Sequence, residues 1–481
     1  MVRHIVRRSA SATVRASAAT LAVAAAGLVA CSEPPGRTPT SPLDSDGRHL
    51  RDERGRIALL RGVNARVQGV FDVTFDDGRT PVEDIPPLTA DDCRRMRALG
   101  FDHLRLPINW SGVEPQRDVF DEAYLDRVDA AVTCAADAGL LVVIDLHQDA
   151  YSKEIGEDGA PLWAIVPPPE MLLEGPLTDL DQRRTSTQVT RAFDSFFAAG
   201  DPHGLQAEFL AMLEHVARRW ADHPAVIGFE IFNEPTVGFA LVDAFNIAAA
   251  AALRAAAPRK LVFFEPSAIR NFTDGVPTAD APFPVDGAVY APHVYTFVFR
   301  ADPTALEQLT PADLEPSVAL ARVEAEAWGT PLWIGEFGVG PRTPNADLWM
   351  GVQHELHDRY LASNAFWLWK EESQGAWGLF DWDPLAATWT ERPQVVGWFQ
   401  RVRASRLAGT VVENRWDRTT GRLRLEIARG SARGVPHEIF VPEARAATFT
   451  ATCDGAPVTG ARDAASGMIE LACEGVLEVS P

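Results

Sequence analysis

The chain has 481 residues, of which 46% are hydrophobic and 23% charged, a globular composition long enough for a large barrel and a smaller domain. Its formal net charge of −21 provides no basic excess to neutralise phosphates or anionic lipid, so we expect no nucleic-acid partner and no electrostatic attachment to a membrane. Its 13 tryptophans outnumber its 5 tyrosines, and indoles suit both core packing and stacking on sugars.

Residues 1–31 are typical of an export signal. Arginines precede the apolar stretch LAVAAAGLVAC, which is too short and too rich in alanine for a membrane span. The final LVAC resembles a bacterial lipobox that would lipidate Cys31; the alternative is ordinary cleavage nearby, with Cys31 incidental. We therefore expect an exported protein, either a cell-envelope lipoprotein with Cys31 as its membrane tether (at the outer membrane in a Gram-negative host) or a secreted one. Residues 32–49, rich in proline and serine, predict a linker.

Four further cysteines remain after the signal. An even count in an exported protein permits two disulfides, and the obvious pairings are Cys93 with Cys134 and Cys453 with Cys473. No Cys-x-x-Cys or His-Cys cluster is present, so we expect no metal.

From about residue 56, short apolar runs alternate with amphipathic stretches. Near-continuous apolar runs fit parallel strands buried on both faces. The runs span residues 57–64, 103–110, 140–148, 226–234, 261–266, 288–295, 331–338 and 365–372. One helical stretch, residues 205–220, places five apolar side chains on one face. The pattern predicts an α/β fold, a (β/α)8 TIM barrel over residues 50–406; a doubly wound sheet is the competitor, but no glycine-rich phosphate loop follows any strand.

Polar residues fall at or near the carboxyl ends of these strands. In a barrel those ends form one mouth, where active sites are built. The residues are Arg105, His147, Asn233, Glu234, His293, Tyr295 and Glu336. Seven placements on one rim favour a functional site over a purely structural explanation, although His293 alone would more often be structural and Arg105 alone could be a structural partner for a carboxylate.

The chain from residue 407 to 481 has a different pattern. Its apolar runs are short or alternating and are separated by turn residues, which predicts an antiparallel β-sandwich domain.

Two glutamates have the placement that glycosidic bond cleavage requires. Glu234 and Glu336 end the fourth and seventh predicted strands, which face each other across a barrel mouth. Two carboxyl groups about 5–5.5 Å apart cleave such a bond with retention: one attacks the sugar, and the other protonates the leaving oxygen. We expect the neighbouring negative charge to raise the pKa of the acid until the nucleophile is glycosylated.

Other rim residues suggest a setting for these two. Asn233 would bond a sugar hydroxyl, and Arg105 and Tyr295 would hold the nucleophile by hydrogen bonds. His293 would contact the acid or the sugar, and Trp367 would form the floor on which the cleaved sugar stacks.

The motif IGFEIFNEPT matches the signature around the acid/base of glycoside hydrolase family 5. LRGVN, LRLPINW, APHVY, WIGEFG and FWLWK resemble that family's other strand-end blocks, in order, over about residues 50–405. The resemblance implies a (β/α)8 barrel, a retaining mechanism and no cofactor. It assigns Glu234 as acid/base and Glu336 as nucleophile. The subsite of the cleaved sugar would be lined by Arg105, His147, Asn233, His293, Tyr295 and Trp367.

The block DLHQDAYS, residues 145–152, is similar to one found in endoglycoceramidases. That likeness implies that Asp145 and His147 contact the glucose next to the lipid, and that the substrate is a glycosphingolipid or another β-glucoside. Arg66 stands where a lysine touching the sugar is expected, so the length and linkage of the glycan stay open.

The insert at about residues 150–203 is where we would look for a surface that contacts a lipid substrate. Its stretch PLWAIVPPPEMLLEGP either packs down onto the barrel or forms an exposed apolar lip for acyl chains. The candidates are Trp163, Ile165, Met171 and Leu172, with Phe297 and Phe299 as a second wall.

Three interpretations therefore remain. The first is a monomeric, membrane-tethered retaining glycosidase acting on glycosphingolipids. The second is a β-glucanase or exo-β-glucosidase acting on soluble sugars, and the third is a carbohydrate-binding surface lipoprotein without catalysis. The presence of both glutamates argues against the third.

Overall fold

The structure is a computed structural model that describes residues 43–481 except 300–303 and 373–376. The predicted signal peptide, Cys31 and most of the predicted linker lie outside the described residues.

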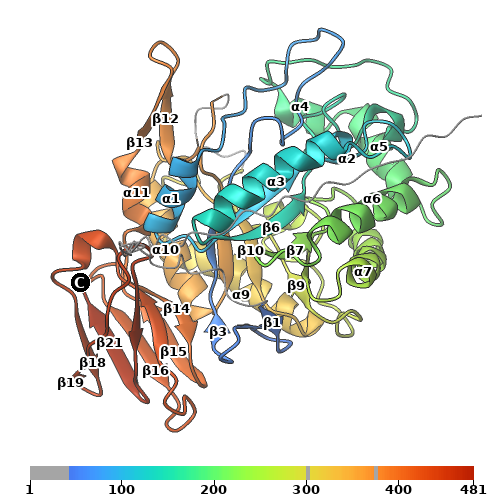
Figure 1. Ribbon diagram of the computed structural model, residues 1–481. Coiled ribbons are helices and arrows are strands. Elements are labelled where there is room, and N and C mark those ends of the chain that lie inside the picture. Colours follow the sequence, from blue (N-terminus) through green and yellow to red (C-terminus); the bar gives the residue numbers. More distant parts are fainter. Residues whose placement is uncertain (1–42, 300–303, 373–376) are drawn as a thin grey trace, which may run out of the picture. The chain divides into compact units, whose positions relative to one another are not determined.

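Eight parallel strands form the barrel (Figure 1). In chain order they are β4 (Arg61–Asn64), β5 (His103–Ile108), β6 (Leu141–Leu146), β7 (Val226–Glu230), β8 (Leu261–Phe264), β9 (Ala288–Tyr290), β10 (Trp333–Phe337) and β11 (Ser363–Phe366). Each pairs in parallel with its neighbour, β11 pairs with β4, and isolated parallel bridges join Tyr290 to Leu332 and Val294 to Phe337. The predicted (β/α)8 barrel is confirmed.

Helices surround these strands. They are α1 (Ala90–Ala98), α2 (Trp110–Val113), α3 (Glu122–Asp137), α4 (Leu180–Arg184), α5 (Thr187–Phe196), α6 (Leu205–Trp220), α7 (Phe239–Ala256), α8 (Arg270–Thr273), α9 (Pro311–Trp328), α10 (Ala346–Arg359) and α11 (Pro393–Phe399), with 3-10 turns at Leu162–Ala164 and Glu443–Arg445. The predicted apolar face of α6 is buried: Leu205, Phe209, Leu213, Val216 and Trp220.

Local signals in the sequence set helix ends. Thr89 begins α1 with a capping box to Asp92, in which each side chain accepts a backbone hydrogen bond. By length and composition alone, α7 is apolar enough to span a membrane. It packs against α6 and β8 and buries Val242, Phe245 and Leu253, as the core helix of a barrel does.

Two antiparallel sheets follow the barrel. One takes β14 (Arg403–Leu407), β17 (His437–Phe440) and β20 (Met468–Leu471) together with the N-terminal strands β1 (Asp44–Ser45), β2 (Leu50–Arg51) and β3 (Ile57–Ala58). The other takes β15 (Val411–Trp416), β16 (Leu423–Ile427), β21 (Val476–Ser480), β18 (Thr450–Cys453) and β19 (Ala456–Pro457). Residues from both sheets form one hydrophobic cluster. A hairpin, β12 (Phe380–Asp383) with β13 (Thr388–Glu391), stands apart from them.

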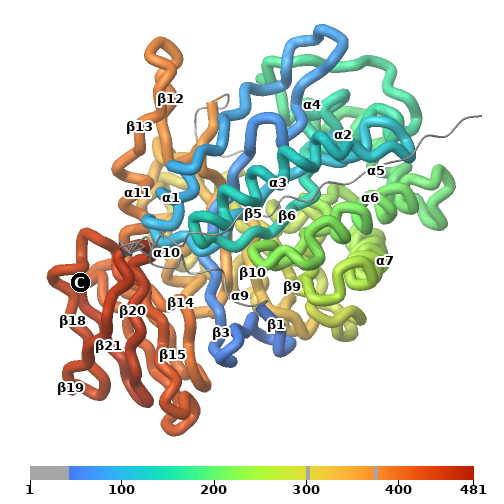
Figure 2. Tube along the Cα trace, in the orientation of Figure 1, coloured from blue at the N-terminus to red at the C-terminus, as the bar shows by residue number. Residues whose placement is uncertain are grey.

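The N-terminal strands were not expected in this part of the molecule. β3 pairs with β14, so the predicted strand 57–64 is divided between two sheets (Figure 2). The physical reason is that one edge of β14 needs a partner for its backbone hydrogen bonds, and the segment before the barrel supplies it.

Both expected disulfides are present. Cys93–Cys134 joins α1 to α3, and Cys453–Cys473 closes a loop within the tail sheets. A buried polar contact joins the tail to the barrel, because Asn414 Nδ2 of β15 donates to the carbonyl oxygen of Asp358 in α10 at 3.0 Å.

The barrel interior has two levels. An apolar cluster that includes Leu60, Val143, Phe263 and Trp333 fills part of it. Buried charged side chains, with Arg105 at their centre, occupy the level of the strand ends. This polar level is the candidate site.

Candidate active site

Glu336, on β10, is held by two strong hydrogen bonds. Arg105 Nη1 donates to its Oε1 at 2.7 Å, and the hydroxyl of Tyr295 donates to its Oε2 at 2.7 Å. A cation and a phenol that both donate to a carboxylate stabilise its ionised form and fix its orientation. These are the properties that a nucleophile requires.

Glu234, which follows β7, has an unusual backbone. Its φ of 44° lies in the left-handed region, which costs a non-glycine residue energy and is found most often at functional sites. Gln148 Nε2 supports this conformation by donating to the carbonyl oxygens of Asn233 (2.6 Å) and Glu234 (3.1 Å). The strain therefore directs the Glu234 carboxyl into the mouth, where its side chain is 21% exposed.

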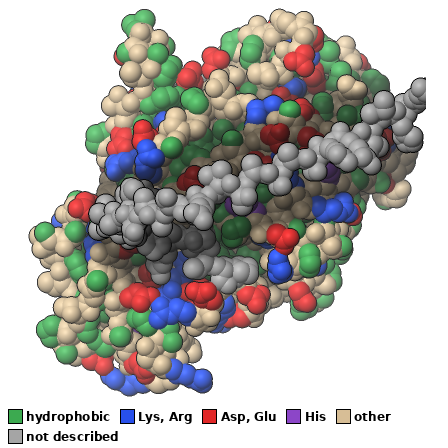
Figure 3. Space-filling model, in the orientation of Figure 1, with side chains coloured by type: hydrophobic (Ala, Val, Ile, Leu, Met, Phe, Trp, Pro, Cys, Tyr) green, Lys and Arg blue, Asp and Glu red, His purple; other side chains and the backbone are tan. Residues whose placement is uncertain are grey.

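The carboxyl group of Glu234 has two partners. Its Oε1 lies 2.7 Å from Nδ1 of His293 and accepts a hydrogen bond from Asn271 Nδ2 at 2.7 Å. One oxygen of Glu234, one of Glu336 and a ring nitrogen of His293 all lie within 4.8 Å of one another. The face shown in Figure 3 is hollowed near its centre, where acidic and histidine side chains gather.

Arg105 organises the buried polar level. It is completely buried; its Nε donates to Glu230 Oε2 at 2.6 Å, and its two terminal nitrogens donate to Asn64 Oδ1 (2.9 Å) and Asn233 Oδ1 (2.8 Å). Burial lowers the pKa of Arg105, but the charges of Asp145 and Glu230 outweigh that effect and raise it well above its usual value. Arg105 is a permanent cation beneath both glutamates.

His147 and Trp367 form one wall of the mouth. Their rings are nearly parallel, with centroids 5.6 Å apart, and Trp367 is half-buried. Burial and the charge of Arg105 lower the pKa of His147 to about 3, so its ring is neutral. Nδ1 of His147 lies 2.7 Å from Asp145 Oδ2. The ring proton is therefore assigned to Nδ1, and Nε2 of His147 is a hydrogen-bond acceptor. Burial raises the pKa of Asp145 to about 6, against the charge of Arg105.

Arg66, at the position where a lysine was expected, is buried among three carboxylates. It pairs with Glu83 at 2.6 Å, Glu157 at 3.2 Å and Glu371 at 3.4 Å. Its guanidinium lies 5.9 Å from the centroid of Trp367. Arg66 therefore supports the wall of the mouth.

The expected raised pKa of Glu234 is wrong for the free enzyme. Burial does raise it, but the hydrogen bond and charge of His293 outweigh burial and lower the pKa of Glu234 to about 2. Burial lowers the pKa of His293, whereas Glu336 and Glu234 raise it, with a net increase. His293 and Glu234 are thus a hydrogen-bonded pair at the mouth.

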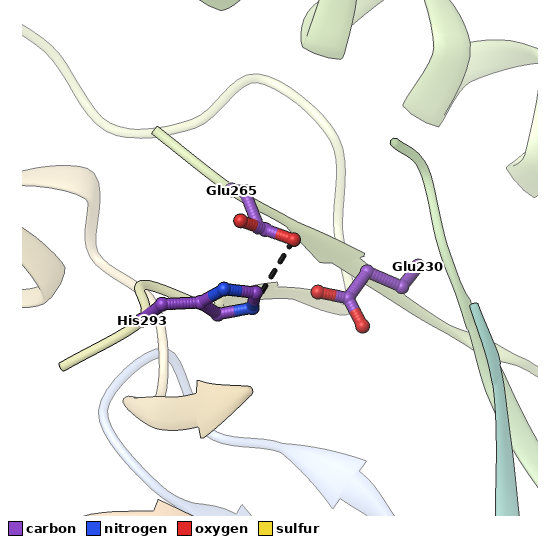
Figure 4. A group of neighbouring side chains, drawn as sticks. All are labelled: Glu230, Glu265 and His293. Atoms are coloured by element: carbon purple, nitrogen blue, oxygen red, sulfur yellow. Dashed lines mark ion pairs between the residues drawn. The ribbon is translucent and has the colours of Figure 1, made fainter. Parts of the chain in front are cut away.

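Two acids beneath the mouth escaped prediction. Glu230 and Glu265 are buried in β7 and just after β8, and their carboxyl groups point toward the ring of His293 (Figure 4). Each lies inside an apolar run, in GFEIF and LVFFEP, and the only signal was an isolated charge in such a run. Asn271 lies on α8, away from the end of any strand, so no sequence pattern pointed to it.

Among the residues that the structure describes, two triplets have donor atoms close enough to hold a cation: Glu230 with Glu265 and His293, and Glu234 with His293 and Glu336. Arg105 ion-pairs with Glu230, Glu265 and Glu336 at 2.6–3.5 Å. It thereby supplies the positive charge that these carboxylates need, and we propose no metal.

The predicted apolar lip is only partly exposed. Ile165 is buried, and the half-buried Trp163 packs edge-on against Trp110, so this part of the insert packs onto the barrel. Met171 and Leu172 are 62% and 41% exposed. In the second wall, Phe299 is 43% exposed and contacts the ring of Tyr295, whereas Phe297 is half-buried.

A second exposed apolar group lies beside Glu234. Phe272, next to Asn271 in sequence, is 68% exposed, and Ile269 and Leu241 are also exposed. The two segments that carry them are joined by a backbone hydrogen bond from Ala268 to the carbonyl oxygen of Pro235.

A parallel (β/α)8 barrel with two glutamates facing each other at its mouth defines a glycoside hydrolase. Residues 71–373 match the family Cellulase (glycosyl hydrolase family 5), and the chain belongs to that family.

Several similar proteins are named as enzymes of glycolipids. The chain is 31% identical over 336 residues to endoglycoceramidase I of Rhodococcus hoagii, an alignment that covers 64% of each chain. It is 26% identical over 250 residues to a glucosylceramidase of Rhizopus delemar, covering 42% of this chain and 37% of that enzyme. The chain thus spans less than two thirds of the length of these relatives.

Solved structures give the same picture over a longer range. An endogalactoceramidase is 25% identical with a TM-score of 0.73, covering 92% of this chain and 100% of that one. Endo-glycoceramidase II from a Rhodococcus species, in complex with ganglioside GM3, is 26% identical with a TM-score of 0.72, covering 90% and 99%.

Proposed function

We propose that this protein is a retaining β-glycosidase that cleaves the bond between the sugar and the ceramide of glycosphingolipids. The observation that carries the mechanism is the separation of Glu234 and Glu336, whose nearest oxygens lie within 4.8 Å. Retaining glycosidases have carboxyl groups about 5–5.5 Å apart, whereas inverting enzymes need about 6.5–9.5 Å to admit a water molecule.

The partners of each glutamate fit its role. Glu336, oriented by hydrogen bonds from Arg105 and Tyr295, attacks the anomeric carbon, while Glu234 gives a proton to the departing oxygen. In the second step Glu234 takes a proton from water, and the resulting hydroxide displaces Glu336 from the sugar. Two inversions at one carbon restore the original β configuration.

A lipid leaving group is supported by the surface beside the acid. The leaving oxygen must lie next to Glu234, and the exposed Phe272, Ile269 and Leu241 lie on the segments that flank this residue. Exposed apolar side chains close to the acid favour contact with acyl chains or a membrane. The named relatives act on the same class of molecule, since they are endoglycoceramidases and glucosylceramidases.

A soluble glucan is the second candidate substrate. The chain is also 28% identical over 268 residues to cellodextrinase A of Ruminococcus flavefaciens. A non-catalytic sugar-binding role is disfavoured because both glutamates keep the hydrogen bonds that catalysis requires.

Export and a membrane tether complete the proposal. Two disulfides in the described chain suit an oxidising compartment. Lipidation of Cys31 would hold the enzyme beside its membrane substrate as a monomer.

The test is mass spectrometry of the products formed from a ganglioside, glucosylceramide and a soluble β-glucan, with the Glu336→Gln variant as the inactive control. We expect ceramide together with an intact oligosaccharide or, from glucosylceramide, free glucose. Cleavage of the glucan alone would overturn the lipid assignment and leave a soluble-sugar hydrolase. Unchanged turnover by Glu336→Gln would overturn the mechanism.

A further inference from the structure

The hairpin of β12 and β13 ends in a turn made of exposed apolar residues. Residues 384–387 read PLAA, and all four are exposed. Leu385 is 98% exposed, more than any other large apolar side chain among the described residues. Turns are usually built from glycine, proline, asparagine, aspartate and serine, and only the proline of this tip fits that pattern. A contiguous, fully exposed apolar tip marks a surface for an apolar partner.

The backbone of the tip is prepared to leave water. Pro384 has no N–H, and the N–H groups of Leu385 and Ala386 donate to Oδ1 of Asp383 at 2.9 and 3.1 Å. A backbone N–H that enters lipid without a partner is costly, which is why irregular backbone is rarely exposed to lipid. Because Asp383 supplies the partner from within the turn, these groups stay bonded in an apolar setting.

Two tryptophans lie one step below the tip. Trp382 and Trp389 are register partners on the two strands, their ring centroids are 4.8 Å apart, and both are half-buried. Tryptophan is enriched at the level of lipid headgroups, where its ring is apolar and its N–H is wet. Leu385 is three residues beyond Trp382, so it extends at most about 10 Å past the pair. Interfacial segments enter a bilayer to a similar depth, about 5–10 Å.

The base of the hairpin is fixed to the rim of the barrel mouth. Glu391 of β13 pairs with Arg95 of α1 at 2.5 Å. Just before β12, the ring of Trp377 lies 6.0 Å from that of Tyr295, the residue that donates to Glu336. From this base the hairpin stands away from α1 and α11 (Figure 1). A bilayer that receives the tip therefore lies beside the mouth.

The charge of the protein decides which lipid surface fits. The chain has a net charge of −21, and the hairpin itself carries Asp381, Asp383 and Glu391. Anionic lipid repels such a surface, whereas a zwitterionic bilayer does not. Apolar insertion needs no basic residues, and salt does not screen it.

We propose that residues 382–389 form a docking tip that enters a zwitterionic lipid surface and holds the mouth beside it. The inference rests on the proposed function, because a ceramide-linked substrate lies in such a surface. It goes beyond that function, since the docking tip contacts the bilayer and not the bond that is cleaved. A soluble glycoside gains nothing from it.

The first test places an environment-sensitive dye on the tip of the full chain. Four of the five cysteines are in disulfides, so Cys31→Ser with Leu385→Cys leaves a single reactive thiol and also removes the predicted lipid tether. On phosphatidylcholine vesicles we expect the emission of the dye to shift to the blue and to be quenched by brominated acyl chains, at low and at high salt. Val412→Cys, at a 61% exposed position of β15, is the matched control and should show neither effect.

Three results of this measurement would overturn the inference. They are no shift at residue 385, equal shifts at residues 385 and 412, and a shift at residue 385 that appears only when phosphatidylserine is added. The last would indicate electrostatic attachment in place of apolar insertion.

The second test is kinetic and uses Leu385→Asp. For a ganglioside in phosphatidylcholine vesicles we expect kcat/KM to fall by about 10-fold or more, because a leucine no longer enters lipid and a charge replaces it. For a soluble aryl β-glycoside kcat/KM should stay unchanged. Val412→Asp should alter neither value. Equal losses on the two substrates, or no loss on vesicles, would overturn the claim that the tip holds the mouth beside the membrane.

The two measurements separate this inference from the proposed function. If the wild-type enzyme cleaves neither substrate, the proposed function fails, and the dye on phosphatidylcholine vesicles still decides whether the tip enters lipid. If the wild type cleaves the ganglioside but the dye at residue 385 does not shift, only the docking tip fails.

Discussion

Arg105 donates a hydrogen bond to Glu336 across 2.7 Å from a position with no exposed surface. Burial of a lone guanidinium is costly, and here three carboxylates at 2.6–3.1 Å offset the cost: Glu230, Glu336 and Asp145. The same contact orients the carboxylate of Glu336. The core of the barrel and the nucleophile are therefore stabilised by one charge.

Tyr295→Phe should slow catalysis without loss of fold. The change removes one of the two hydrogen bonds to Glu336, and a bond to a charged group contributes about 1.5–3 kcal/mol, so kcat/KM should fall by about 10-fold to 150-fold. Steady-state kinetics on an aryl β-glycoside measure this. Tyr360→Phe, which removes a bond to the distant Glu315, is the control and should leave kcat/KM unchanged. Equal kinetics in the two variants would contradict the role of Tyr295.

Glu234→Ala should be rescued by azide. The variant can still form the glycosyl-enzyme from a dinitrophenyl β-glycoside, but it has no base to activate water. Azide needs no base, so we expect turnover to rise with azide and the product to be a β-glycosyl azide, identified by NMR. An α-glycosyl azide would show inversion and contradict the two-step mechanism.

Phe272→Asp should affect only lipid substrates. Its ring is 68% exposed, its neighbour Asn271 hydrogen-bonds Glu234, and a charge there would repel acyl chains. We expect KM for a glycolipid in micelles to rise about 10-fold to 150-fold, since loss of a buried aromatic contact costs about 1.5–3 kcal/mol, while kinetics on a soluble aryl glycoside stay the same. Val412→Asp, a matched change at a 61% exposed position of β15, should alter neither. A rise in KM for both substrates would indicate a general effect on the mouth.

His354→Leu should stabilise the protein, and more so in acid. His354 of α10 is buried, and neither ring nitrogen has a partner among the described residues. Burial and the charge of Arg401 hold its pKa well below 6.5 when folded. Below about pH 6.5 the unfolded chain binds a proton here and the folded chain does not, so the wild type loses stability as the pH falls.

Leucine lacks both the unpaired polar group and this proton. The gain in unfolding free energy should be about 1–3 kcal/mol at pH 7. It should grow by about 1.4 kcal/mol per pH unit below 6.5. Chemical denaturation at pH 7 and pH 5 measures it, and a gain that shrinks at pH 5 would contradict the assignment.

The fold and the rim were predictable because each depends on a local pattern. Each barrel strand is a short apolar run, and the two glutamates end such runs after β7 and within β10. The rim residues therefore follow from strand ends alone. What the pattern could not predict depends on contacts between distant segments.

Three features show this limit. The strand β3 leaves its apolar run to pair with β14, some 350 residues later in the chain, and no local signal records that partner. The pKa of Glu234 falls because His293 lies 2.7 Å away, a distance fixed only by closure of the barrel. Glu265 lies in an apolar run, LVFFEP, and was not predicted as a site residue. Its neighbours in sequence do not show that its side chain faces the barrel interior.

The most direct test of the account is to trap the covalent intermediate. A 2-deoxy-2-fluoro β-glucoside with a dinitrophenyl leaving group slows the second step more than the first, so the glycosyl-enzyme accumulates. Peptide mass spectrometry should then find the fluorosugar on Glu336, in the peptide that contains WIGEFG. A label on another residue, or hydrolysis of this compound with inverted configuration and no labelled peptide, would contradict the central claim.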